Sequence, residues 1–458
     1  MPGPAGAGAP ERGPTPARAI ALRVLLRVER GAFADAALDQ ALSAATLPER
    51  DRALVTALVD GTLRWRGRLD YALTHYLRRG LDSLTPAIRT ILRLGAYQIL
   101  LMDAIPARAA CDEAVRMART RGHPGTAALV NAVLRRLADD GEPPLPDRIA
   151  DEAGYMSLAY SHPRWLVERW ITNFGSAAAE AICEAGNRPA PVCLRPNRLR
   201  TDARGLTAVL AAEGMTVAPS AITAQALRLT SGGNPARASA YGKGLFTVQG
   251  DGSILVGLAA QPPRGAQVLD MCAGIGGKAT HMAELMDNEG HILALDRQGA
   301  KLAKLNQECA RLGISIIETR EADARAIQLD GGYDLCLLDA PCSGTGALRR
   351  RVDSRWRRAV AQIPQLAALQ RELLARAVAL VRPGGIVVYS VCSLEPEEGE
   401  GVVSAVTAAA GLRLEDCRGI VLGVPDSAFA AGGAIRLMPH LHDTDGMFIA
   451  RLRKETRP

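Results

Sequence analysis

The sequence predicts a multidomain protein with an all-α N-terminal domain, a small α+β module and a C-terminal α/β domain. Three observations predict this fold class. Apolar residues recur at helical spacing up to residue 140, helical and short extended patterns mix between 151 and 250, and apolar strands alternate with helices from 251. Such alternation is typical of a doubly wound, mostly parallel sheet. We expect domains over 16–140, 151–250 and 251–455.

The length and the cysteine content bound the class of protein. A chain of 458 residues is too long for one ordinary domain. Its nine cysteines are odd in number and include no Cys-x-x-Cys pair, which argues against a disulfide framework and a zinc site. No apolar stretch is long enough to cross a bilayer, and the Pro/Gly/Ala-rich start lacks the apolar core of a signal peptide. We expect a cytoplasmic protein with no membrane partner.

The net charge of +7 permits a polyanionic partner but does not identify one. Only five residues are lysine, so nearly all the basic residues are arginine. Biased codon usage explains this abundance as well as RNA binding does.

The predicted N-terminal domain contains helices only. Residues 1–15 hold almost nothing to bury and are expected to be a disordered tail, and Pro16 suits the first turn of the first helix. Arg64, Arg66 and Arg68 around Trp65 fit contacts to RNA phosphates, but a solvated helix face explains them better on these residues alone. Further helices are expected at 34–45, 49–65, 67–78, 85–103, 107–120 and 124–138, before a Pro-rich linker at 139–146.

The middle module mixes helices and short strands. One helix is expected to run to about residue 174, and two more are expected over 176–186 and 202–213. Strands are expected at 192–195, 227–229 and 244–248. In the α/β domain the expected strands are 268–270, 291–295, 315–319, 335–338 and 386–389, and the expected helices are 279–286, 299–312 and 362–381. The segments 436–439 and 445–452 are expected to form a hairpin on the edge of the sheet.

A glycine-rich loop over 272–278 follows the first strand of the α/β domain and opens a helix. Glycines let the backbone approach a ligand closely, and a helix N-terminus favours negative charge. Asp296 ends the next strand, where a carboxylate accepts hydrogen bonds from ribose hydroxyls, and Asp323 follows the third. The combination predicts a nucleoside cofactor.

The same loop leaves an alternative open. Gly274, Gly276 and Ala279 also fit a loose dinucleotide-binding pattern, which a nicotinamide or flavin enzyme would share. The phosphate-binding P-loop pattern fails because Cys272 stands where its first glycine belongs.

Two cysteines are expected at carboxyl ends of strands in the α/β sheet. Cys342 ends the run Asp339-Ala340-Pro341-Cys342, and Cys392 lies in Tyr389-Ser390-Val391-Cys392-Ser393. A single cysteine is usually a small buried hydrophobic residue. Cys342 and Cys392 are better candidates for a functional role, because ligands of open α/β sheets bind at the carboxyl edge of the sheet.

The glycine loop and the two cysteine motifs together resemble the RNA (cytosine-5)-methyltransferases of the Nop/Sun family. The N-terminal helical domain is similar to the RNA-binding antitermination factor NusB. The combination resembles bacterial Sun-type enzymes that act on 16S rRNA, and it covers nearly the whole chain from Pro16. The class I methyltransferase fold, which is Rossmann-like, is therefore expected for the C-terminal domain.

The resemblance implies a role for each cysteine. Cytosine C5 is too weak a nucleophile to take a methyl group until a thiolate has added to C6. In the family the cysteine that matches Cys392 is this nucleophile, and the one that matches Cys342 assists product release. A Pro-Cys pair considered alone favours Cys342 instead, because DNA cytosine methylases use such a cysteine. Asp339 is implied to hydrogen-bond the cytosine edge.

The resemblance also implies S-adenosyl-L-methionine as the cofactor. Asp296 is implied to bind its ribose, Asp323 to lie near its adenine, and Asp339 to lie beside it. The loop residues implied to bind it are Cys272, Ala273, Gly274, Ile275, Gly276, Gly277 and Lys278. No metal is implied. The chain departs from the family pattern, without loss of a reactive group, at Ile275, Ala279, Val391 and Gly399.

The implied partner is 16S rRNA before full subunit assembly, bound by a monomer. The alternatives are a tRNA cytosine-5 methylase, a non-catalytic assembly factor with this fold and an amino-methyltransferase. The NusB-like domain disfavours the first, the two cysteines with their acids disfavour the second, and the Pro-Cys motif disfavours the third. Arg349–Arg351 and the arginines at 355, 357 and 358 fit a phosphate-gripping loop or a solvated charged loop about equally.

Overall fold

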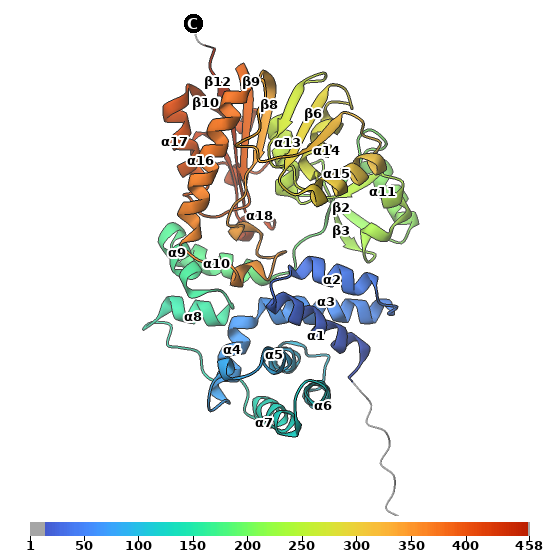
Figure 1. Ribbon diagram of the computed structural model, residues 1–458, viewed down its shortest axis with the longest axis vertical. Coiled ribbons are helices and arrows are strands. Elements are labelled where there is room, and N and C mark those ends of the chain that lie inside the picture. Colours follow the sequence, from blue (N-terminus) through green and yellow to red (C-terminus); the bar gives the residue numbers. More distant parts are fainter. Residues whose placement is uncertain (1–13, 457–458) are drawn as a thin grey trace, which may run out of the picture. The chain divides into compact units, whose positions relative to one another are not determined.

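The computed structural model describes residues 14–456, so most of the tail expected over 1–15 lies outside the described residues. The described chain divides into two compact units. Figure 1 colours the chain along its sequence, from blue at the N-terminus to red at the C-terminus. Unit 1 extends through Cys183 and includes Arg351–Arg357. Unit 2 consists of Glu184–Arg350 and the chain from Arg358 onward.

Unit 1 is built from helices, as the sequence predicts. The boundaries agree with the predicted ones to within about three residues, because Pro, Gly and polar residues end the apolar periodicity at the same places. The short helix α8 is not among the predicted elements. The helices are α1 (Pro16–Glu29), α2 (Ala34–Ser43), α3 (Glu49–Arg64), α4 (Arg66–His75), α5 (Pro86–Leu101), α6 (Ala107–Arg119), α7 (Pro124–Asp140), α8 (Glu152–Ala159) and α9 (Arg164–Phe174).

The short segment Arg351–Arg357 belongs to unit 1 although the chain around it belongs to unit 2. Val352 is 1% exposed and packs in the helical core. The Trp356 indole N–H donates to the Leu63 carbonyl at 2.7 Å, and Arg355 donates to the Ser161 carbonyl at 2.8 Å. Buried backbone acceptors need such donors, so this segment completes the helical unit.

Unit 2 begins after most of α10 (Ser176–Asn187) with a small module. Its antiparallel sheet has the order β2-β3-β1-β4. The predicted strands and helix are present, while β2 and α12 are not among the predicted elements. The elements are β1 (Cys193–Pro196), α11 (Ala203–Ala212), β2 (Thr216–Pro219), β3 (Leu227–Ser231), α12 (Ser239–Gly242) and β4 (Phe246–Val248).

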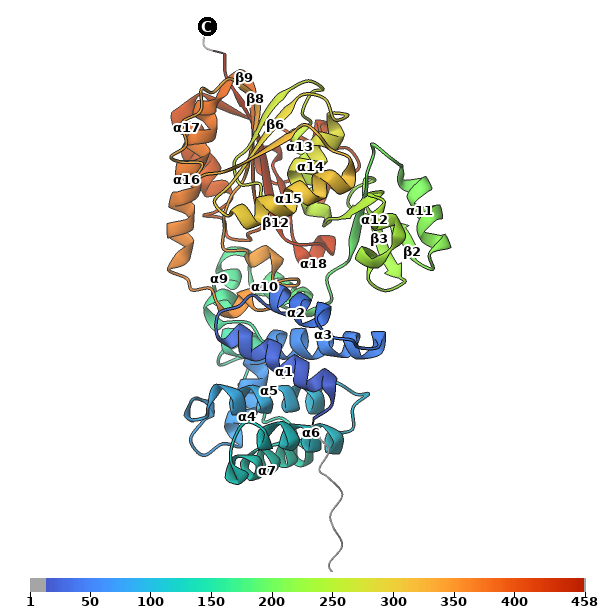
Figure 2. The same cartoon turned by 45° about the vertical axis from the view of Figure 1, so that its right-hand side comes forward.

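The rest of unit 2 is an α/β domain on an eight-stranded sheet of order β10-β12-β9-β8-β5-β6-β7, with β11 paired to β12. Helices α13, α14 and α15 pack on one face and α16 and α17 on the other (Figures 1 and 2). Its strands are β5 (Gln267–Asp270), β6 (His291–Asp296), β7 (Ile317–Glu321), β8 (Tyr333–Asp339), β9 (Val381–Val391), β10 (Leu412–Glu415), β11 (Ile435–Leu437) and β12 (Met447–Lys454). Its helices are α13 (Asp251–Ala260), α14 (Gly277–Leu285), α15 (Gly299–Leu312), α16 (Gln362–Leu380), α17 (Glu400–Ala410) and α18 (Pro439–His442).

The predicted C-terminal hairpin is only partly correct. β11 does pair antiparallel with β12, but β12 lies inside the sheet, antiparallel to β9 on one side and to β10 on the other. The unpredicted strand β10 takes the edge position instead. The sheet is therefore mixed, with a parallel half that runs from β9 to β7.

The strand β8 is buried on both faces, which explains its continuous apolar sequence. Leu335 and Leu337 pack under α13–α15, and Cys336 and Leu338 pack under α16 and α17. No helix over residues 14–456 is long and apolar enough to cross a membrane.

A buried ion pair joins the small module to the α/β domain. The Arg195 guanidinium on β1 lies 2.7 Å from the Glu284 carboxylate on α14, and both side chains are 1% exposed. Arg195 also donates to the Gly277 carbonyl at 2.9 Å and to Thr280 at 3.2 Å. The first turn of α14 is thus held by a strand of the other module.

Replacement of Glu284 by Ala leaves the Arg195 charge buried without its carboxylate partner. We expect a loss of about 3–5 kcal/mol in the free energy of unfolding of unit 2, measured by denaturant titration. Glu289→Ala is the matched control, because its side chain is 54% exposed and pairs with the exposed Arg264. Its effect should stay below about 1 kcal/mol. Equal effects for the two variants would contradict the role of the buried pair.

Candidate active site

The carboxyl ends of four neighbouring strands carry the candidate site. β5 ends at Asp270, β6 at Asp296 and β8 at Asp339, and Ser390 on β9 is in register with Asp339. Ligands of open α/β sheets bind at this edge. Three carboxylates therefore lie along one edge of the parallel half of the sheet.

The two cysteines singled out in the sequence are brought into contact. The Sγ atoms of Cys342 and Cys392 are 3.4 Å apart, and both side chains are half-buried. The loop after β8 and the end of β9 stay bonded beyond the strands, since the Ala340 N–H donates to the Ser390 carbonyl at 2.9 Å. The Gly346 N–H donates to the Cys392 carbonyl at 3.0 Å. These backbone hydrogen bonds join the two segments that carry the thiols.

Asp339 lies beside the thiols and is held on both oxygens. The Ser390 hydroxyl donates to Oδ1 at 2.7 Å, and the Lys278 ammonium contacts Oδ2 at 2.6 Å. Burial opposes the charged form of Lys278, yet the Asp339 carboxylate raises the pKa of this lysine above its usual value, and the charge of Cys392 adds to the effect. Lys278, from the glycine loop, therefore reaches the cysteine motifs.

The glycine loop leaves open backbone where a ligand would lie. Gly274 has a φ of +60°, a Cβ atom added there would have no neighbour within 4 Å, and its N–H donates to Asp296 Oδ2 at 3.0 Å. Gly276 has a φ of +87°, and a Cβ there would meet Leu305. Gly276 therefore needs both a positive φ and the absence of a Cβ atom, and only glycine meets these two requirements. The exposed Ile275 side chain, at 59%, leaves the loop surface apolar.

Asp270 belongs to the site although no role was predicted for it. It is 1% exposed, and its Oδ2 has no hydrogen-bond partner among the described residues. Burial and then the Asp339 charge raise the pKa of Asp270 to about 7. With Asp296 and Asp339 it gives the edge an excess of carboxylates, which suits a cationic ligand. The signal in the sequence is its place at the end of an apolar strand, directly before the glycine-rich loop.

Asp323 lies next to this edge, because the Ala322 N–H donates to the Asp296 carbonyl at 3.1 Å. Its carboxylate accepts hydrogen bonds from the Arg325 side chain at 2.8 and 3.1 Å, and these bonds lower the pKa of Asp323 to about 2. A ligand that uses this carboxylate has to share it with Arg325.

The basic run after the Cys342 motif is largely used inside the protein. The Arg349 side chain is 3% exposed, and Arg350 lies 2.6 Å from Asp445. Arg355 is 1% exposed and donates to the Ser161 carbonyl. These guanidinium groups are paired with carbonyls and acids of the protein itself, so the phosphate-gripping interpretation is wrong for them. Arg351 is exposed, so the phosphate-gripping interpretation still stands for this residue.

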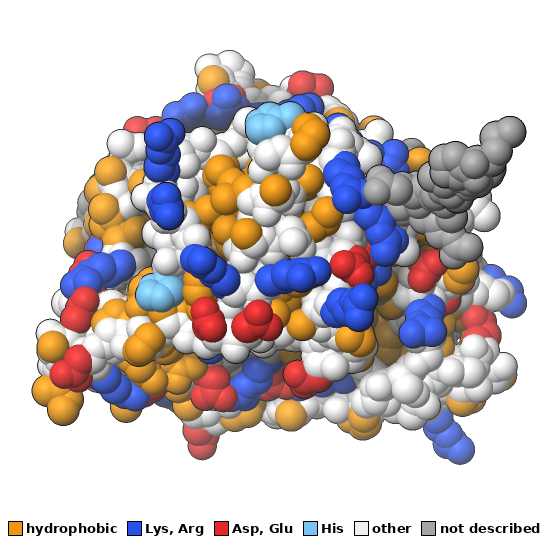
Figure 3. Space-filling model, turned by 90° about the horizontal axis from the view of Figure 1, so that it is seen from below, with side chains coloured by type: hydrophobic (Ala, Val, Ile, Leu, Met, Phe, Trp, Pro, Cys, Tyr) orange, Lys and Arg blue, Asp and Glu red, His pale blue; other side chains and the backbone are white. Residues whose placement is uncertain are grey.

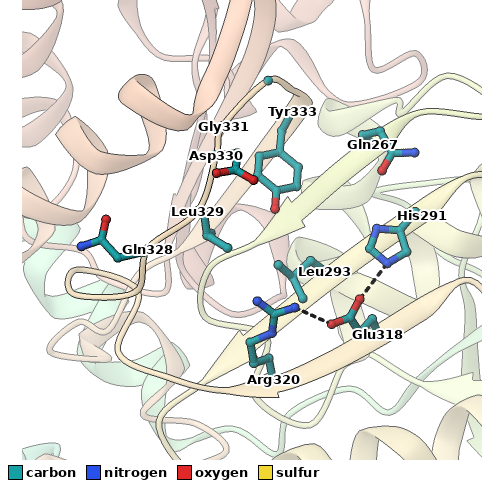
Figure 4. A pocket seen from close by; sticks show the side chains of 11 residues that line it. Gln267, His291, Leu293, Glu318, Arg320, Gln328, Leu329, Asp330, Gly331 and Tyr333 are labelled. Atoms are coloured by element: carbon teal, nitrogen blue, oxygen red, sulfur yellow. Dashed lines mark hydrogen bonds and ion pairs between the residues drawn. The ribbon is translucent and has the colours of Figure 1, made fainter.

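A hollow at the opposite edge of the sheet has different chemistry. Gln267, His291 and Tyr333, the first residues of β5, β6 and β8, line it together with Glu318 (Figure 4). The Glu318 carboxylate lies 3.1 Å from His291 and 2.7 Å from Arg320. No cysteine lines this hollow, so it is separate from the candidate active site. Over residues 14–456 no cluster of side chains could hold a metal ion.

A second hollow, on unit 1, is basic. It lies between α6 and α7 and is lined by Arg116, Arg119, His123, Asn131 and Arg135. Figure 3 views the side of unit 1 on which α6 and α7 lie and shows Arg side chains around apolar ones. A concave surface of this kind suits phosphate groups.

Comparison with protein-family models divides the chain into three matched regions. Residues 258–453 match 16S rRNA methyltransferase RsmB/F, residues 15–139 match the NusB family, and residues 162–235 match the ferredoxin-like domain of RsmF/B-like methyltransferases. These matches agree with the expected fold class.

Two curated relatives span nearly the whole chain. The probable ribosomal RNA small subunit methyltransferase B of Bacillus subtilis is 34% identical over 447 residues, which cover 96% of this chain and 99% of the relative. The ribosomal RNA small subunit methyltransferase B of Xanthomonas campestris is 35% identical, with 95% and 97% covered.

Two solved structures share the fold. PH0851 superposes with a TM-score of 0.82 at 26% identity and covers 96% of this chain and 99% of its own. NSun6 from Pyrococcus horikoshii, solved with SFG, has a TM-score of 0.59 at 24% identity and covers 64% of this chain and 99% of its own.

The contact between the two thiols can be tested by oxidation. Diamide should convert the Cys342 and Cys392 thiols to one disulfide, with loss of two hydrogens to the reagent, because the sulfur atoms already touch. Peptide mass spectrometry should find this cross-link first, and dithiothreitol should reverse it. The buried Cys336 on β8 is the internal control and should stay reduced. Cross-linking of other pairs at the same rate would contradict the geometry.

Proposed function

Because this chain belongs to the RsmB/F family of methyltransferases, we propose that it transfers a methyl group from S-adenosyl-L-methionine to C5 of a cytosine in 16S rRNA. The observation that carries the proposal is the pair of thiols 3.4 Å apart beside Asp339 at the carboxyl edge of the sheet. The methyl donor of the family is S-adenosyl-L-methionine. The cytosine specificity and the covalent route are the proposed parts.

The two-thiol site supports a covalent mechanism. The Cys392 thiolate adds to C6 of the base, an S–C6 bond forms, and the electron pair moves to C5, which becomes nucleophilic. C5 would then take the methyl group from the sulfonium donor, whose S–CH3 bond breaks to leave the neutral thioether. The C5 proton would pass to water, and the S–C6 bond would break to return the Cys392 thiolate and restore the ring. A thiolate is required because the neutral thiol is a poor nucleophile. Lys278 supports this form of Cys392, and Cys342 is placed to assist release.

Asp339 is the residue proposed to hold the base. Its side chain is 30% exposed. Ser390 bonds one carboxylate oxygen and Lys278 bonds the other. A carboxylate has further lone pairs for the cytosine edge. In this arrangement Asp339 supports positive charge at N3 as the thiolate adds.

The residues around the glycine loop fit the cofactor. When bound, S-adenosyl-L-methionine supplies a methyl group on a positively charged sulfur atom. The carboxylates of Asp270, Asp296 and Asp339 favour that charge, and the orphaned Asp270 Oδ2 offers an acceptor for a donor group. We assign cofactor contacts to the loop 272–278. Asp296 is assigned to bind the ribose hydroxyls, and Asp323 is assigned to lie near the adenine.

Unit 1 and the small module are proposed to bind the RNA. The basic hollow of α6 and α7 suits the phosphate backbone. The target base has to leave its stack to reach a thiolate, and this is easier before the subunit is fully assembled. We propose that the protein acts as a monomer, with functional domains over 16–140, 151–250 and 251–455. A tRNA cytosine is the alternative substrate within the same chemistry.

The function is tested by bisulfite sequencing of rRNA and tRNA from cells that lack the protein. One cytosine of 16S rRNA should lose its methyl group and regain it when the wild-type chain is supplied. The Cys392→Ala variant should not restore it. An unchanged 16S map would refute the proposal, and loss of a tRNA methylation instead would support the alternative substrate.

Separate variants assign the two thiols. Cys392→Ala removes the nucleophile, so it should abolish methylation and form no adduct with RNA. Cys342→Ala leaves the nucleophile but impairs release, so a covalent protein–RNA complex should accumulate on denaturing gels. An adduct with Cys392→Ala and none with Cys342→Ala would show that the roles are reversed.

A further inference from the structure

One fully buried carboxylate holds both cysteine loops, and the function proposed above does not use it. Glu398 lies between β9 and α17 and is 0% exposed. Its Oε1 accepts from the Ser343 N–H at 2.8 Å and from the Gln370 side chain at 3.0 Å. Its Oε2 accepts from the hydroxyls of Ser343 and Ser393, the latter at 2.5 Å.

The partners of Glu398 are the neighbours of the two thiols. Ser343 directly follows Cys342, and Ser393 directly follows Cys392. The two serine hydroxyls are themselves 3.1 Å apart. One carboxylate therefore bonds both loops at the residue next to each sulfur. Because four donors converge on a group that only accepts when ionised, the arrangement suits a negative charge.

Further contacts keep the same loops in place. Gln370 also donates to the Pro341 carbonyl at 2.9 Å, and Arg358 donates to the Ser343 carbonyl at 2.8 Å. Arg436 donates to the Ser393 carbonyl at 3.2 Å. These donors come from α16, from the segment that precedes it and from β11, so the loops are held from several elements.

The charges around the two sulfur atoms are unequal. The hydrogen bond with Cys392 and burial raise the pKa of Cys342 well above its usual value, and the charges of Cys392, Glu398 and Asp339 add to this effect. Lys278, in contrast, is attracted to Cys392. The titratable or charged groups that face this pair include Asp339 from β8, Tyr389 from β9, Lys278 from α14, Arg358 and Glu398.

We infer that Glu398 is a positioning residue that fixes the distance between the two thiols and assigns the thiolate to Cys392 and the neutral thiol to Cys342. The division of labour between the cysteines rests on the proposed function. The assignment of charge does not, because it is a property of the protein without RNA. Glu398 does not contact the substrate, since its carboxylate is fully enclosed by protein.

The test measures alkylation of each thiol by iodoacetamide from pH 6 to 11, with the two cysteine peptides separated by mass spectrometry. In the wild-type protein Cys392 should react at lower pH than Cys342. Glu398→Gln keeps the shape but removes the charge, so the midpoint of Cys342 should move down by about one pH unit or more. The direction follows because a nearby negative charge disfavours the thiolate.

Glu372→Gln on α16 is the matched control, since this side chain is 63% exposed and lies near Arg325. Its alkylation profile should equal that of the wild-type protein. A Cys342 profile that is the same in Glu398→Gln and in the wild-type protein overturns the inference. The conservative Gln variant keeps the test valid if Glu398→Ala fails to fold.

Steady-state kinetics give a second readout. Glu398→Gln should lower kcat for methylation by about tenfold or more while KM for RNA stays unchanged, because the buried residue acts through the thiols. A rise in KM with unchanged kcat overturns the positioning role. If the wild-type protein methylates no RNA but the alkylation profiles differ as expected, the proposed function fails and the charge assignment stands.

Discussion

Parallel pairing of β8 with β9 is the constraint on which the candidate site depends. The register places Asp339 opposite Ser390, so two motifs whose cysteines are fifty residues apart end at the same edge of the sheet. The strands can pair in this way because both are apolar and are covered on both faces by helices. A shift by one residue would turn Asp339 away from Lys278 and separate the thiols.

The site edge concentrates charge in a buried environment. Asp270, Asp296 and Asp339 end three adjacent strands, and Lys278 is the cation that contacts Asp339. Carboxylates in such surroundings are costly unless a positive group lies near them. A cationic cofactor therefore does more than fill the glycine loop, because its charge offsets that of the acids. Unequal charge also explains how two neighbouring thiols can take different protonation states.

Much of the fold could be predicted from periodicity. The helices of unit 1 and the strands β5, β6 and β8 lie where apolar spacing and flanking Pro or Gly place them. The position of β12 could not be predicted, because which neighbour an antiparallel strand joins depends on sheet topology and not on its own residues. Likewise, nothing local marks 351–357 as part of unit 1, since Val352 and Trp356 acquire that role only by packing against distant helices.

The reactive groups could be identified without the structure: they are the two cysteines after strands, Asp339, the glycine loop and Asp296. Their spacing and their resemblance to one family are local properties of the chain. The tertiary structure alone decided how these groups act on one another. It brought the sulfur atoms into contact, placed Lys278 on Asp339, added Asp270 to the edge and enclosed Glu398 between the loops. It also turned Arg349 and Arg355 inward, because a guanidinium that finds buried carbonyls and acids is no longer available to RNA.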